Sequence, residues 1–245
     1  MNKSTGNLVH WKFSRLVKTV PFYLMIGVCL LVGLGYVPFL LSDGVENASE
    51  LLCKTQSNIA SMLDLFAGLF AALCIAHDIQ NRFVSIAVMT GNKISSVLLA
   101  EFFSFAGTLF TAVFIPCVIS YLIGGVAVGF AGVGIAVCLL EAGVFAFVCV
   151  AAFGIAIPFS FIIKGEGFSC IVNLIVLILC WCGAEFLFEL GAESVLSYTA
   201  FGQVFMMCGG DFSAIVLSKA FVVGAVALTV IYTITYLILR KMELK

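Results

Sequence analysis

The stretch CIAHDIQNRFVSIAVMTGNKISSVLLAE, residues 74–101, changes from apolar to polar and back to apolar within a short length of chain. At helical spacing its polar part forms two adjacent stripes, a polar one of Asp78, Arg82 and Ser85 and an apolar one of Ile79, Phe83 and Ile86. A helix that lies flat at a membrane surface satisfies both stripes. We therefore predict a surface helix over residues 79–94 that connects two membrane-spanning segments.

The composition is that of an integral membrane protein. Of the 245 residues 63% are hydrophobic and 10% are charged, with a mean hydropathy of +1.22, whereas soluble domains are roughly 25% charged. The apolar runs reach the ~20 residues that a helix needs to cross a bilayer, and strand-like alternation is absent. We expect an all-α, polytopic protein of the cell membrane, built as a single transmembrane domain over residues 1–245.

The hydropathy pattern predicts six spans, at residues 22–41, 59–77, 96–123, 131–162, 168–188 and 215–239. The first is expected to remain in the mature chain, because its apolar run exceeds the ~7–15 residues of a signal-peptide core. The fourth is longer than a bilayer requires. We expect Pro158 to end or kink it.

Residues 8–20 precede the first span and predict an amphipathic helix at the membrane interface, an elbow before the first crossing. Lys12, Arg15 and Lys18 follow one another at steps of three, and Trp11 lies beside them. We expect these cations to face anionic lipid head groups.

The distribution of Lys and Arg predicts that both termini are cytoplasmic, because loops on that side of a membrane carry an excess of positive residues. With this orientation the cytoplasmic cations are Lys3, Lys12, Arg15, Lys18, Arg82, Lys93, Lys164, Arg240, Lys241 and Lys245. The remaining two, Lys54 and Lys219, are then on the outside. The outer loops instead contain acidic residues.

No catalytic or cofactor motif is found in the sequence. The chain has no G-x-x-x-x-G-K-[ST] phosphate loop, no G-x-S-x-G and no H-E-x-x-H, and its two histidines are His10 and His77. We expect no catalysis, no metal site and no nucleic-acid binding.

Eight of the ten cysteines lie in or beside spans and are interpreted as small hydrophobic residues. Cys53 and Cys208 lie in outer loops, where a bond between them is possible but no pattern supports it.

Glu141 is the acidic residue that we expect deepest in the bilayer, near the middle of residues 133–156. A buried carboxylate there costs several kcal/mol unless it is protonated, paired or hydrated. Two interpretations stay open, a substrate or ion contact in a translocation path and a protonated carboxyl bonded to a neighbouring helix. Asp64, Glu185 and His77 are interpreted as solvated helix-end residues. Glu101 is close enough to the surface to meet Lys93 or a neighbouring basic residue.

The segment 189–213 is unusually apolar for an outer loop and contains Phe201, Gly202, Gly209 and Gly210. Neither arm is long enough to cross the membrane. We predict a helical hairpin that dips into the outer leaflet. The glycines of residues 124–134 predict a tight outer hairpin between spans three and four.

In this order the parts resemble those of the permease subunits of ABC-2 type exporters. Residues 74–83 followed by 89–101 look like that family's acidic end of span two, its coupling helix and its small-plus-basic turn. The tail at 236–245 is similar to the family's usual ending. Glu101 departs from the pattern, since relatives often carry Lys there. In size the chain looks most like the small permeases of peptide, lantibiotic-immunity and bacitracin-type exporters.

The resemblance implies a non-catalytic membrane subunit that pairs with a second permease chain and with a separate ATPase, the latter holding ATP and Mg. Asp78, Arg82, Phe83 and Lys93 would couple the ATPase to the spans, although a solvated helix face also explains Asp78 and Arg82. Glu141 and the 189–213 segment would face a peptide, lantibiotic or hydrophobic drug. The alternatives are a six-span capture subunit of a vitamin or metal importer, and a structural or regulatory membrane protein without transport.

Overall fold

The computed structural model describes residues 3–130, 133–163 and 165–243. Ala131, Gly132, Lys164 and Lys245, which the sequence analysis used, lie outside the described residues, as do the side chains of Lys3 and residues 242–243. The described chain is helical throughout, with turns and no strand. Its elements are α1 (Lys3–Leu16), α2 (Val20–Gly35), α3 (Val37–Ser42), α4 (Ala48–Ala71), η1 (Ala72–Ala76), α5 (His77–Gln80), α6 (Phe83–Met89), α7 (Ile94–Ala127), α8 (Ile135–Phe153), α9 (Ala156–Ile162), α10 (Glu166–Glu189), α11 (Glu193–Leu196), α12 (Ala200–Cys208) and α13 (Ala214–Glu243).

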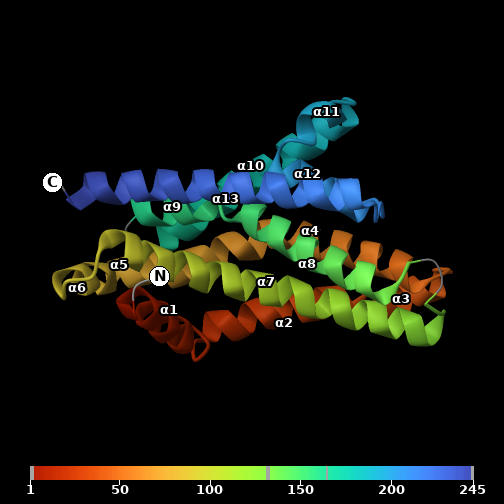
Figure 1. Ribbon diagram of the computed structural model, residues 1–245, viewed down its shortest axis with the longest axis horizontal. Coiled ribbons are helices and arrows are strands. Elements are labelled where there is room, and N and C mark those ends of the chain that lie inside the picture. Colours follow the sequence, from red (N-terminus) through yellow and green to blue (C-terminus); the bar gives the residue numbers. More distant parts are fainter. Residues whose placement is uncertain (1–2, 131–132, 164, 244–245) are drawn as a thin grey trace.

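Within the described chain, six helical stretches are long and apolar enough to span a membrane, which confirms the predicted all-α architecture with six spans. They are Val20–Ser42, Ala48–Gln80, Ile94–Ala127, Ile135–Ile162, Glu166–Glu189 and Ala214–Lys241. The spans run lengthwise in an elongated bundle (Figure 1). Helices α1, α5 and α6 and the last turns of α13 lie at one end, called the α6 end, and α3 and the α7–α8 connection lie at the other, called the α3 end.

The second span is much longer than predicted, because it begins at Ala48 rather than at residue 59. The side chain of Asn47 caps its first turn by accepting a hydrogen bond from the Glu50 backbone N–H. Thr55 and Gln56 belong to the added turns and are fully buried. Thr55 and Gln56, which the sequence places in a loop, therefore lie on the buried face of a helix.

Two spans are interrupted near proline. Helix α8 ends at Phe153 and α9 begins at Ala156, two residues before Pro158. This break agrees with the expected effect of Pro158, because proline lacks an N–H and its ring clashes with the carbonyl one turn earlier. A similar interruption at Tyr36 separates α2 from α3, which carries Pro38. By contrast, α7 continues through Pro116.

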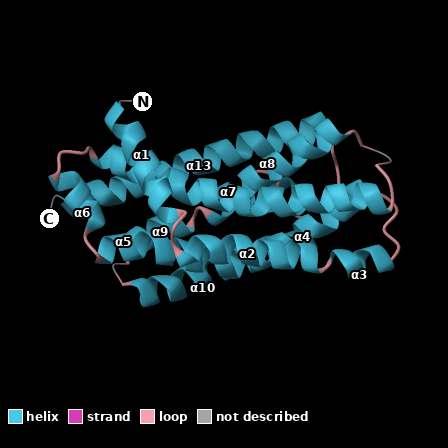
Figure 2. Ribbon diagram, turned by 90° about the horizontal axis from the view of Figure 1, so that it is seen from below, coloured by secondary structure: helices cyan, strands magenta, loops and turns pink. Residues whose placement is uncertain are grey.

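Helices α4 and α8 belong to the most buried spans, whereas the spans of α2, α10 and α13 bury the smallest share of their residues. Seen in Figure 2, α2, α4 and α10 share one side of the bundle. Helix α10 crosses α4 closely at Gly68, where an added Cβ would lie 3.1 Å from the Leu177 side chain and 3.2 Å from Asn173. The Asn173 amide donates to the Gly68 carbonyl at 3.3 Å and fastens this crossing.

The 189–213 segment folds as α11 and α12. Thr199 caps α12 by accepting from the Gly202 N–H, and a Cβ on Gly202 would lie 2.1 Å from the Leu196 carbonyl, so glycine permits this tight turn. Helix α12 packs against α8, α4 and α13 and buries Val204 and Met207. Phe201 meets Phe153, the last residue of α8, at 5.4 Å between ring centroids.

Candidate functional site

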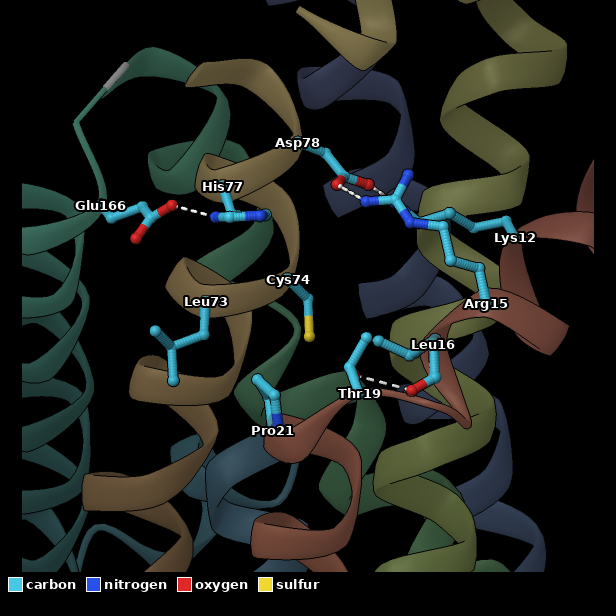
Figure 3. Close-up of a pocket in the computed structure, with 10 residues that line it drawn as sticks. All are labelled: Lys12, Arg15, Leu16, Thr19, Pro21, Leu73, Cys74, His77, Asp78 and Glu166. Carbon is cyan, nitrogen blue, oxygen red and sulfur yellow. Dashed lines mark hydrogen bonds and ion pairs between the residues drawn. The ribbon is translucent and has the colours of Figure 1, made fainter. Parts of the chain in front are cut away.

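Four charged side chains meet near the α6 end and are called the charge cluster: Lys12 and Arg15 of α1, Asp78 of α5 and Glu101 of α7. Lys12 Nζ donates to Asp78 Oδ2 and, at 2.6 Å, to Glu101 Oε1. Arg15 Nη2 donates to Asp78 Oδ1 at 2.6 Å, as Figure 3 shows. Lys12, Asp78 and Glu101 are at most 6% exposed. The cluster therefore joins three elements that are far apart in sequence.

Lys12 was expected to face lipid head groups, and this prediction is wrong. Helix α1 packs along α7, and Lys12 donates hydrogen bonds to both Asp78 and Glu101. The physical reason is that two buried carboxylates require a compensating cation more strongly than lipid head groups attract one. Trp11 on α1 and Lys18 in the turn after α1 are exposed. Glu101 is bonded to Lys12 rather than to the exposed Lys93.

The predicted surface helix over 79–94 is instead two short helices, α5 and α6, here called with their flanking turns the surface segment (residues 77–93). Arg82 separates them in the left-handed conformation, with φ 59°, and Gly91, with φ 89°, turns the chain toward α7. Asp78 is not on an exposed polar stripe as predicted, because the charge cluster buries it. Arg82 and Lys93 are exposed.

Helix α6 projects from the bundle with no buried residue. Its apolar residues Phe83, Ile86 and Met89 are 38%, 52% and 85% exposed. The Arg15 guanidinium lies 4.0 Å from the Phe83 ring centroid, which ties α6 to the charge cluster through a cation–π contact. The surface segment thus has an open apolar face and a direct connection to α1.

A cavity of about 310 Å³ opens beside the charge cluster (Figure 3). Lys12, Arg15 and Asp78 form one side, and the π-helical turn η1 contributes Leu73 and Cys74. On another side His77 Nδ1 is hydrogen-bonded to Glu166 Oε1, which links α5 to the first residue of α10. His77 is solvated, as predicted, but it also contacts a second span.

Glu141 lies in α8 and is 2% exposed. Its Oε2 accepts a hydrogen bond from Gln56 Nε2 at 2.7 Å. Within the described chain, Glu141 Oε1 and Gln56 Oε1 have no hydrogen-bond partner. Glu141 follows the first residue of α8 by six positions and is therefore nearer the α3 end than the predicted mid-span position. Gln56 is not evident as a partner from the sequence, because the predicted second span begins at residue 59 and leaves Gln56 in a loop.

Asp64 takes the mid-span position instead. It was interpreted as a solvated helix-end residue, and the early start of α4 overturns this, because residue 64 is the midpoint of Ala48–Gln80. Its Oδ1 is buried, and no described group bonds to it.

Cys53 and Cys208 are free thiols that border one cavity of about 570 Å³ near the α3 end.

No three His, Cys, Asp or Glu side chains of the described residues gather in a way that suits a metal ion. The geometry assembles instead a paired charge cluster under an exposed surface segment. No protein-family model matches the chain, and no curated protein and no solved structure is significantly similar to it.

Proposed function

We propose that this chain is the membrane-spanning permease subunit of an ATP-driven exporter of the ABC-2 type. In this proposal a separate ATPase binds the surface segment from the cytoplasm, so that both chain termini are cytoplasmic. Two permease chains form the translocation path, and α1 acts as the elbow helix. The substrate is a peptide, a lantibiotic or a hydrophobic drug.

The observation that carries the proposal is the connection between the exposed α6 and the charge cluster. Phe83 contacts Arg15, and Arg15 is paired with Asp78, which shares Lys12 with Glu101 of α7. A force applied to α6 therefore reaches α1 and the longest span through short, directional contacts. A capture subunit for a vitamin or a metal has no need of such a linked external element.

The faces of the bundle support a second permease chain. Helices α2 and α10 leave large apolar side chains exposed, among them Leu31 at 74% and Leu179 at 66%. These faces suit lipid or another chain. In the proposal, α12 and Glu141 lie beside the path, with Phe201, Gly202, Gly209 and Gly210 shaping the segment that re-enters the bundle.

The test is co-purification with P-loop ATPases encoded next to this chain. Ile86 and Met89 are exposed on α6, so the double substitution Ile86→Asp and Met89→Asp is expected to leave the fold intact and to reduce ATPase capture at least 10-fold. Val195→Asp is the matched control, because Val195 is 59% exposed on α11 and distant from α6. Equal capture by wild type and double variant, or no ATPase captured by wild type, would contradict the proposal.

A further inference from the structure

Five polar side chains form one stripe along α4, here called the α4 polar stripe: Glu50, Lys54, Ser57, Ser61 and Asp64. Their spacing of four, three, four and three residues places them on one helical face. Ser57 and Ser61 are exposed, and the side chains of Glu50 and Lys54 are 38% and 40% exposed. The rest of α4 is among the most buried parts of the bundle. The stripe is therefore an open polar face on a central span.

The stripe ends where α10 crosses α4. Gly68, one turn beyond Asp64, continues the same helical line and is covered by Asn173 and Leu177. From this crossing α10 runs away from the bundle toward α11 (Figure 1). At its other end the stripe borders the cavity of about 570 Å³, which Glu50, Lys54 and Ser57 help to line. A polar track thus leads from the α3 end to Asp64 at mid-span.

The charge of Asp64 is not compensated by the described residues. No described cation forms an ion pair with it, and the cation of the stripe, Lys54, is paired with Glu50 at 2.9 Å. Lys54 precedes Asp64 by ten positions, which is about 15 Å along a helix. A carboxylate at the bilayer centre costs several kcal/mol when it faces lipid. The arrangement calls for a cation or water, not hydrocarbon, at this face.

Asp64 offers a single carboxylate. Among the described residues no three His, Cys, Asp or Glu side chains gather in a way that suits a metal ion, and Met62 and Leu65, close to Asp64 in sequence on α4, are 37% and 40% exposed. A ligand held by Asp64 therefore meets one carboxylate on a helix that also exposes apolar side chains. This combination favours a bulky organic cation over a small hydrated metal ion, which needs several oxygen ligands.

We infer that Asp64 binds the cationic group of an amphipathic solute, which reaches it along the α4 polar stripe. The inference rests on the proposed function only for the use of this site in export; the binding itself requires no ATPase. It names the substrate class as amphipathic cations, and it places the contact at Asp64 rather than at the buried Glu141.

The test measures binding of tetraphenylphosphonium to the purified full chain in lipid nanodiscs, with empty nanodiscs as the lipid baseline. Tetraphenylborate, which has nearly the same shape and the opposite charge, is the ligand control. We expect saturable binding of the cation, at least 10-fold weaker binding by Asp64→Asn, and recovery to within about threefold of wild type by Asp64→Glu. Glu185→Gln, which neutralises an exposed acid on α10, is expected to leave binding unchanged.

Equal binding by wild type and Asp64→Asn, or equal binding of the cation and tetraphenylborate by wild type, would overturn the inference. So would an Asp64→Asn effect confined to permease dimerisation, measured by native mass, because the stripe would then be covered by a second copy. If Asp64→Asn aggregates on size-exclusion chromatography, two measurements still test the inference. They are the binding by Asp64→Glu and the preference of the wild type for tetraphenylphosphonium over tetraphenylborate. Asp64-dependent binding without ATPase capture would reject the proposed function and leave this inference standing.

Discussion

Two aspartates on the same span have opposite surroundings. Asp78, near the α6 end, accepts from Lys12 and Arg15 and is 3% exposed. Asp64, fourteen residues earlier, is at mid-span with no described cation paired to it. The first acid is compensated inside the chain and fixes helices together. The negative charge of the second acid has to be balanced by a group outside the described chain, which is typical of a binding residue rather than of a structural one.

Removal of the shared cation is expected to have the largest effect. Lys12→Met leaves Asp78 and Glu101 buried without the lysine that bonds to both. Breaking a buried ion pair from one side costs about 3–5 kcal/mol in the free energy of unfolding. The measurement is thermal and denaturant unfolding in detergent micelles, followed by tryptophan fluorescence.

The matched control is Lys18→Met, which removes an exposed cation from the same basic region and is expected to change stability by less than about 0.5 kcal/mol. A Lys12→Met variant as stable as Lys18→Met would show that the charge cluster does not hold α1 to the bundle. Asp78 would then not be a residue that fixes helices together, and it would no longer contrast with Asp64.

The six spans were predictable because a run of about 20 apolar residues has few stable alternatives in water. The start of α4 was not, because Ser49, Thr55 and Gln56 resemble loop residues until the helices that bury them are known. That one boundary determines how deep Asp64 lies in its span. Moving the start from residue 59 to Ala48 shifts Asp64 to mid-span, and the start of α8 at Ile135 places Glu141 nearer the α3 end.

The charge cluster was also hidden from sequence reasoning, since its ion pairs join residues 63, 66 and 89 positions apart. A basic helix before a span normally indicates contact with lipid head groups. Nothing in the local pattern distinguishes a lysine that faces lipid from one that faces two acids. The useful signal was Glu101, an acid inside a span that required a basic partner.

A smaller effect is expected at the contact between Gln56 and Glu141. Gln56→Leu keeps the approximate size of the side chain and removes the donor to Glu141 Oε2. An acceptor left buried without its partner costs about 1–3 kcal/mol. The same unfolding measurement applies, and Asn58→Leu is the control, because Asn58 is on the same helix and is half-buried. Equal losses in the two variants would mean that the hydrogen bond itself contributes nothing.

The smallest effect on stability is expected at Asp64, and it tests the comparison directly. Asp64→Asn preserves shape and removes a charge that the described chain does not pair, so the free energy of unfolding should stay within about 0.5 kcal/mol of wild type or increase. Asp78→Asn is the matched change on the same span and should lose about 3–5 kcal/mol, because Arg15 and Lys12 lose the negative charge that both pair with, and an amide NH2 group replaces one of the two acceptor oxygens. Both are measured by unfolding in the same micelles. If the two variants lose the same stability, Asp64 is a structural residue held by the fold. If Asp64→Asn keeps the wild-type stability and Asp78→Asn does not, the fold does not require an acid at position 64. The unpaired position of Asp64 at mid-span then supports a role in cation binding.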